Sequence, residues 1–131
     1  MPTPSLPSYT APPLEEVVCG VIFEPLQDFL VPHIGLFCEQ VSETYPRIEE
    51  VPIIGDITEL LGPNGYVVPR IWLINNDDDQ LIQLQKNRLY FNWRKRDNQY
   101  PRFEYVYSAF TSCVDRFVAF LEQNGLGTLV P

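Results

Sequence analysis

The sequence predicts an α+β domain in which two helices cover one face of a mostly antiparallel sheet. Two observations carry this prediction. Residues 70–94 hold three short alternating strand patterns joined by two turns, and residues 103–121 hold a long apolar stripe at helical spacing. A strand pattern and a shorter helix pattern precede them, which gives the order strand, helix, three strands, long helix.

The length of 131 residues suits a single domain, and a hydrophobic content of 45% is enough to build a core. Residues 1–13 contain five prolines and no charged side chain. Such a segment can neither pair as a strand nor continue a helix, so it is predicted to be a disordered arm. Residues 14–131 are predicted to form the domain.

The first strand is predicted over Leu14–Phe23, and Pro25 ends it. Both of its faces are largely apolar, which favours a central strand covered on both sides. A helix is predicted from Pro32 to Tyr45, because apolar residues recur every three or four positions and Pro46 stops the pattern.

Residues 46–69 are rich in proline and glycine and predict a long loop with a short helical turn over Ile57–Leu61. A loop of this length in a compact domain is functional or partly mobile. The next block predicts three strands, with a turn at Asn75–Asp79 and a tight hairpin at Lys86-Asn87. The strands are Arg70–Ile74, Leu81–Gln85 and Arg88–Arg94.

Alternation in this block separates a core face from a polar face. Leu89, Phe91 and Trp93 point one way, and Trp72 and Trp93 are interpreted as anchors of the sheet against the helices. The other face is predicted to be exposed and is the candidate binding surface. Its residues are Gln83, Gln85, Arg88, Tyr90, Asn92 and Arg94.

The final helix is predicted to span about 22 residues at 3.6 residues per turn, with Pro101 near its start and Asn124-Gly125 at its end. Its aromatic stripe is core. The apolar ending after Gly125 is typical of a beginning strand: either a final strand closes the sheet there, or the chain is part of a longer protein.

The formal net charge of −8 argues against a general nucleic-acid coat protein, because phosphate repels an acidic surface. Positive charge is nevertheless concentrated in residues 70–102, whose net charge is +3. Three dispersed cysteines without a Cys-x-x-Cys motif favour the reducing cytoplasm. A signal peptide and an apolar run long enough for a membrane span are both absent from the sequence.

No catalytic motif, metal site or cofactor is predicted. Asp77-Asp78-Asp79 offers oxygen ligands, but three acids after two asparagines are also typical of an exposed turn. His33 is the only histidine, and no nucleophile motif accompanies it, which favours a structural role. A structural reading also exists for Arg70 and Arg94, which can hold Glu15 or Glu24 across the sheet.

Several motifs together resemble an uncharacterised, sporadically distributed prokaryotic protein family, over about residues 12–128. The family's members are about twice as long, so the resemblance implies that this chain is an N-terminal portion. It implies no activity for any residue. The motifs are Pro12-Pro13-Leu14-Glu15-Glu16-Val17, His33-Ile34-Gly35-Leu36-Phe37, Pro69-Arg70-Ile71-Trp72, Leu81-Ile82-Gln83-Leu84-Gln85, Phe91-Asn92-Trp93-Arg94 and Tyr100-Pro101-Arg102.

Three functions follow as hypotheses. The first is a non-enzymatic interaction or regulatory module that docks a protein, or another copy of itself, through the polar hairpin face and the 46–69 loop. The second is nucleic-acid or nucleotide binding by the basic block, and the third is part of an enzyme completed by a missing C-terminal half. The basic block comprises Arg70, Arg88, Arg94, Lys95, Arg96 and Arg102.

Overall fold

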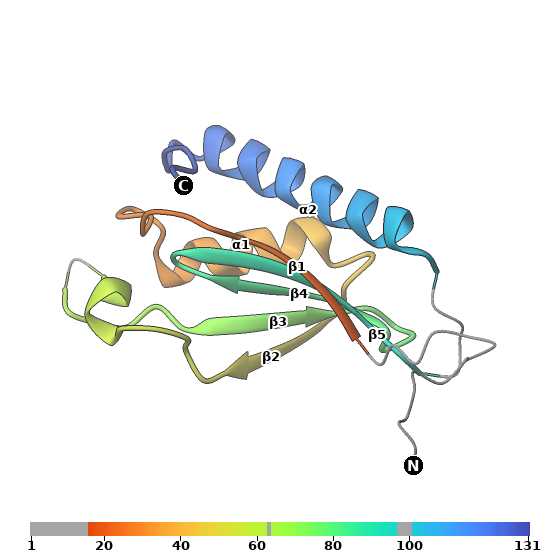
Figure 1. Ribbon diagram of the computed structural model, residues 1–131. Helices are drawn as coiled ribbons and strands as arrows, with labels where there is room; N and C mark the ends of the chain where they lie inside the picture. The colour runs from red at the N-terminus through yellow and green to blue at the C-terminus, as the bar shows by residue number, and fades with distance from the viewer. Residues whose placement is uncertain (1–15, 63, 97–100) are drawn as a thin grey trace, which may run out of the picture.

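The computed structural model describes residues 16–62, 64–96 and 101–131. These form five strands, two α-helices and one 3₁₀ turn (Figure 1). Their bounds, in chain order, are β1 (Glu16–Ile22), α1 (Val31–Val41), β2 (Arg47–Val51), η1 (Ile57–Leu60), β3 (Arg70–Ile74), β4 (Gln80–Gln85), β5 (Arg88–Arg94) and α2 (Phe103–Gln123).

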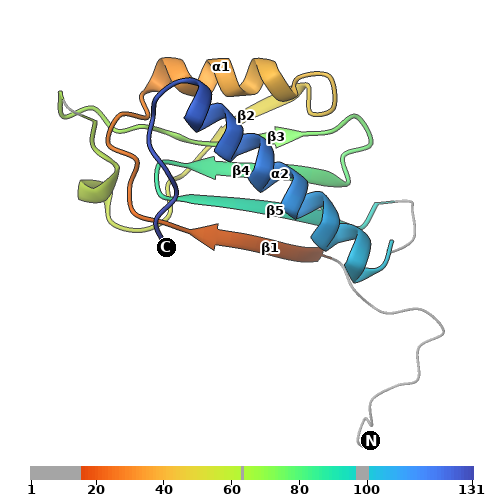
Figure 2. The same ribbon diagram turned by 90° about the horizontal axis from the view of Figure 1, so that it is seen from above.

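The strands form one sheet in the order β1-β5-β4-β3-β2, and every neighbouring pair is antiparallel. Both helices lie on the same face of this sheet, with α2 over β5 and β1 and α1 beside it (Figures 1 and 2). The predicted α+β class and the position of both helices are therefore confirmed. Among the described helices, none is long and apolar enough to span a bilayer.

The core lies between the helices and the inner face of the sheet. Phe117 of α2 is fully buried at its centre and meets Phe23, Phe29 and Phe37, with ring centroids 6.2, 5.7 and 5.3 Å away. The rings of Phe29 and Phe37 are nearly perpendicular to that of Phe117, the edge-to-face arrangement that aromatic quadrupoles favour. Trp93 is buried on this face, as predicted.

The β4–β5 hairpin turns at Lys86-Asn87, as predicted, but Lys86 is 1% exposed. Its Nζ donates to the carbonyl oxygens of Gln27 and Phe29, at 3.3 and 3.4 Å. Burial lowers the pKa of this amine, and the nearby charge of Asp28 opposes that shift. The lysine thereby ties the segment between β1 and α1 to the hairpin.

Two predictions about the sheet are wrong, and the final strand, one of two alternatives for the end of the chain, is not formed. Strand β1 is an edge strand, not a central one, and its burial alternates along its length. Residues 47–51, expected in a loop, form β2 at the opposite edge. Residues 126–131 form no strand; the Leu126 N–H donates to the Leu121 oxygen at 2.9 Å, and the Val130 oxygen accepts from the Glu24 N–H at 2.7 Å. The proline-rich segment 1–13 lies outside the described residues.

Candidate functional site

The strand register gathers the predicted binding residues on the face that looks away from the helices. Gln83 pairs with Tyr90, Gln85 with Arg88, and Asn92 and Arg94 continue along β5. Since side chains alternate between faces, all six share this outer face. The sequence thus placed them on the correct side of the sheet.

A chain of hydrogen bonds crosses four strands of the outer face. Arg70 Nη2 donates to Gln83 Oε1, and Gln83 Nε2 donates to Asn92 Oδ1 at 2.6 Å. Asn92 Nδ2 then donates to Glu16 Oε2, also at 2.6 Å. Every donor points the same way, from the guanidinium on β3 to the carboxylate on β1, so the two charges polarise the amides between them.

The expectation that this face is exposed is wrong for three of its members. Gln83, Gln85 and Asn92 are 7%, 1% and 3% exposed. Gln85 is held by the backbone of Ile54, accepting from its N–H at 2.8 Å and donating to its oxygen at 2.7 Å. Residues 52–56 of the loop are therefore held against the sheet through Gln85. The side-chain amides of Gln83, Gln85 and Asn92 bind groups within the protein rather than solvent.

Arg88 and Tyr90 are only partly covered. The Tyr90 ring lies over Gly20 of β1, where an added Cβ would come within 2.1 Å of a ring carbon, so a larger residue at position 20 would displace the ring. Arg88 donates to the Tyr90 hydroxyl at 3.3 Å and to Asn87 Oδ1 at 3.2 Å. Both side chains are thereby positioned by their neighbours.

Arg94 binds Asp78 in the β3–β4 turn. Glu24, one of the two partners expected from the sequence, is not bound to it, and the other, Glu15, lies outside the described residues. The Nη2 atom of Arg94 lies 2.6 Å from Asp78 Oδ1, and Arg47 and Arg96 reach the same carboxylate at 2.8 and 2.9 Å. The hydrogen bonds from Arg96, Arg47 and Arg94 hold the pKa of Asp78 well below its usual range. Asp78 is therefore an arginine acceptor that fixes the turn.

Trp72 belongs to the outer face, so the interpretation that it anchors the helices is wrong. It pairs with Gln83 across β3 and β4, and the guanidinium carbons of Arg70 and Arg94 lie 5.9 and 5.8 Å from its ring. Both arginines are therefore within cation–π distance of the ring. The signal was present in the sequence, because Ile71 and Leu73 on either side of Trp72 are core residues.

The other candidate chemical groups have structural roles. His33 Nδ1 accepts the Leu30 N–H at 2.9 Å, which caps the start of α1. Cys38 and Cys113 are buried, and Cys19 on β1 is half-buried; all three are free thiols. Burial raises the pKa of each, for Cys113 to about 11. Among the described residues, no group of three His, Cys, Asp or Glu could hold a metal ion.

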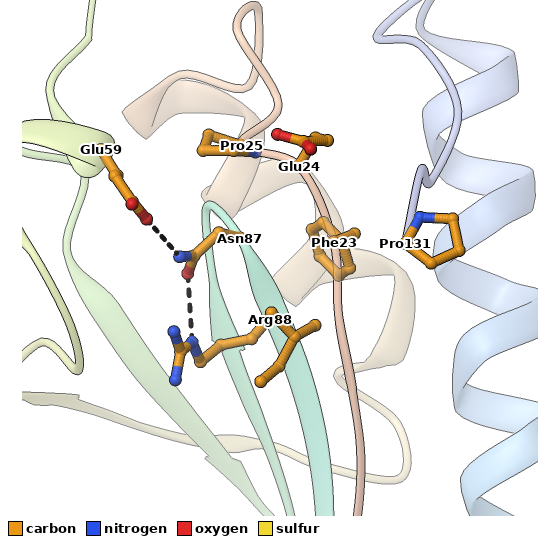
Figure 3. A pocket seen from close by; sticks show the side chains of 8 residues that line it. Phe23, Glu24, Pro25, Glu59, Asn87, Arg88 and Pro131 are labelled. Atoms are coloured by element: carbon orange, nitrogen blue, oxygen red, sulfur yellow. Dashed lines mark hydrogen bonds between the residues drawn. The ribbon is translucent and has the colours of Figure 1, made fainter.

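An open groove of about 460 Å³ lies where β1 ends (Figure 3). Glu59 Oε2 accepts from Asn87 Nδ2 at 3.4 Å on one side, with Arg88 below, and Pro131 borders the other. Glu24 adds a second carboxylate to the lining. Its polar groups mostly bind one another, so the groove offers a shallow mixed-charge surface and no nucleophile with an adjacent base.

Strand β1 has one edge that no described strand covers. The Phe23 N–H donates to Asn87 on the β5 side at 2.9 Å, whereas the Glu24 N–H donates outward, to Val130. By alternation the N–H and C=O groups of Val18, Gly20 and Ile22 point outward. The side chains of Val18 and Ile22, which lie beside this edge, are 51% and 56% exposed.

An apolar stripe of α2 flanks this edge. Arg116 and Gln123 bind Gln40 of α1, which defines the side of α2 that faces α1. At 100° per residue, five apolar residues besides the fully buried Leu121 lie on the opposite side, toward β1. They form the α2 stripe: Phe103, Tyr107, Phe110, Val114 and Val118.

The α2 stripe is partly exposed and internally ordered. Phe103 and Tyr107 are about half exposed, and their rings stack with centroids 5.9 Å apart. Tyr107 in turn meets Phe110 at 6.2 Å. The first turns of α2 lie across the start of β1 (Figure 2), so a strand added beyond β1 would run beneath them. The sequence prediction that Phe103 belongs to the core is therefore wrong, and Tyr107 and Val118 were not singled out by it.

Comparisons of the chain with protein-family models, curated proteins and solved structures found no significant match. The roles of its residues therefore rest on geometry.

Proposed function

We propose that the protein is a non-enzymatic interaction module that accepts a strand from a protein partner along the open edge of β1. The observation that carries the proposal is that, within residues 16–62, 64–96 and 101–131, the outward backbone groups of Val18, Gly20 and Ile22 have no hydrogen-bond partner. Between residues 17 and 22 there is no charge and no proline, the usual devices that keep an edge from pairing. Strand addition supplies affinity through main-chain hydrogen bonds and specificity through alternate side chains.

The opposite edge of the sheet supports this choice by contrast. Strand β2 reads Arg47-Ile48-Glu49-Glu50-Val51 and is short, charged and exposed. Its charges repel most added strands, as protective edges do. Partner binding is thus directed to β1, where the α2 stripe offers an apolar cover for the incoming strand.

Nucleic-acid binding by the basic block has less support. Arg94 and Arg96 bind Asp78, and Arg70 binds Gln83, so a phosphate must compete with short internal contacts. The outer face presents Trp72 and Tyr90, but the guanidinium groups of Arg70 and Arg94 already contact the Trp72 ring, so a base would compete with them for stacking. An enzyme role would need residues beyond those described, and the described clefts bring no acid–base pair together with a nucleophile. Three free thiols lead us to propose a cytoplasmic setting.

Site-specific photo-crosslinking tests the proposal in the cell. With the photo-reactive residue benzoylphenylalanine in place of Val18, we expect a defined adduct, because position 18 borders the unpaired edge. The same residue in place of Ile48 is the matched control, since Ile48 is 54% exposed on the charged edge. The adduct should vanish when Ile22→Lys places a charge on β1. Equal adducts at both positions, or none at position 18, would contradict the proposal.

A further inference from the structure

We propose that the strand that pairs with β1 is β1 of a second copy of this chain, in an antiparallel, two-fold symmetric dimer. This inference rests on the proposed interaction function and names its partner. Antiparallel pairing of a strand with its own copy creates an isologous interface, in which each contact occurs twice. The result is a continuous sheet of ten strands, five from each copy.

The backbone allows only certain registers. Because the even-numbered residues of β1 point outward, an even-numbered residue must face an even-numbered residue of the copy. A pairing centred on Cys19 satisfies this and uses all seven residues of the strand. It sets Val18 opposite Gly20 of the copy, a large side chain against a small one, and leaves Cys19 opposite Cys19.

Charge selects this register over its neighbour. Glu16 is the only charged residue of β1, and pairing centred on Cys19 places it opposite Ile22 of the copy. Pairing centred on Gly20 would instead bring Glu16 opposite Glu24, and like charges directly opposite are destabilising. The outward N–H of Glu24 is already bound to Val130, so the edge available for pairing ends at Ile22. Ile22 is also the last residue that the Cys19 register pairs.

The α2 stripe also contacts the added strand in this register. In this register Val17 lies opposite Val21 of the copy, which places that valine at the start of β1, beneath the first turns of α2 (Figure 2). Phe103 and Tyr107, uncharged and about half exposed, are there to cover it. Both contacts are apolar on apolar, and the symmetry repeats them at the other end of the pair.

The charged β2 edge limits growth, so the assembly closes as a dimer rather than a filament. Seven residues of β1 and five of the α2 stripe make twelve per copy. A standard interface uses roughly 20–30 residues per partner, so we expect a reversible dimer whose population depends on protein concentration.

Cys19 reports the register directly. In antiparallel strands, a pair that does not exchange hydrogen bonds has Cα atoms about 4.5 Å apart, within the range of a disulfide. Mild oxidation with diamide, which takes up the two electrons and two protons, should therefore produce a covalent dimer of twice 15.1 kDa. Cys19→Ser should abolish it, because Cys38 and Cys113 are buried.

Sedimentation velocity across a concentration series tests the interface. The dissociation constant should rise at least about tenfold in Val18→Lys, which places a charge from each copy in the pairing. Ile48→Lys, at a matched exposure on β2, should leave it unchanged. On the helix, Tyr107→Glu should weaken the dimer, and Tyr105→Glu, at similar exposure but on the α1 side, should not.

A protein that stays monomeric throughout the series and forms no Cys19 cross-link would overturn the inference, as would a dimer indifferent to Val18→Lys. Circular dichroism of each variant separates loss of pairing from loss of folding. The proposed function fails separately: a photo-adduct at position 18 with another protein would sustain strand addition while excluding a second copy as the partner.

Discussion

Replacing Phe117 with alanine is expected to lower the free energy of unfolding by about 3–5 kcal/mol. Phe117 is fully buried and contacts three other aromatic rings, from the β1–α1 segment and from α1. Truncation removes the buried ring and leaves a cavity that the sheet on one side and α1 on the other cannot close. Since small domains are stable by only about 5–15 kcal/mol, the loss is a large fraction of the total.

Urea denaturation measures this effect, with Val118→Ala as the matched control. Val118 is the next residue of the helix and is 40% exposed, so its truncation should change the free energy by less than about 0.5 kcal/mol. Phe117→Leu keeps most of the volume and should lie between the two. Equal midpoints for Phe117→Ala and Val118→Ala would mean that α2 does not bury this face.

Replacing Asn92 with leucine is expected to cost about 1–3 kcal/mol, although leucine is the more hydrophobic residue. Asn92 accepts from Gln83 and donates to Glu16, both at 2.6 Å. The substitution leaves the buried Gln83 amide without an acceptor, and it removes one hydrogen bond from a carboxylate. A buried polar group that loses its partner costs more than the hydrogen bond contributed.

A double-mutant cycle isolates the reason. Asn92→Leu is expected to destabilise the protein because it leaves the Gln83 amide without an acceptor. If so, the double variant Gln83→Met/Asn92→Leu should lose less unfolding free energy than the sum of the two single variants, by about 0.5–3 kcal/mol. The measurement is again the unfolding free energy in urea. Strict additivity would show that the two amides do not depend on each other and that the outer-face chain is not a unit.

The strands and helices with strong local patterns could be predicted from the sequence. The bounds of β3 and β5, the hairpin between β4 and β5 and the 21-residue α2 follow from alternation, turn chemistry and helical spacing. Strand β2 could not, because it is five residues long, mostly charged and bounded by prolines. Its hydrogen bonds to β3, rather than its own composition, make it a strand.

The position of β1 at the edge of the sheet could not be predicted, for a different reason. A strand that is apolar on both faces reads the same whether it is central or lies at an edge that another chain covers. The order of strands depends on contacts distant in sequence, and Val18 and Ile22 are exposed in the isolated chain. The same apolar pattern that misled the prediction is what the proposed dimer explains.

The burial of the candidate site residues was also beyond the sequence. Gln83, Gln85 and Asn92 are polar, and polar residues on the outer face of a sheet are normally solvated. Their partners Arg70, Ile54 and Glu16 come from other parts of the chain, so no local sequence pattern predicts these hydrogen bonds. The sequence could place these side chains on one face but not predict that they bind one another.

Residue-resolved amide hydrogen exchange at low and high protein concentration tests the central claim, pairing along the β1 edge, most directly. Amides of Val17, Cys19 and Val21 point toward β5 and should be protected at both concentrations. Those of Val18, Gly20 and Ile22 should exchange rapidly in dilute protein and become protected as the copies pair. Equal exchange of these three outward amides at both concentrations would contradict the claim.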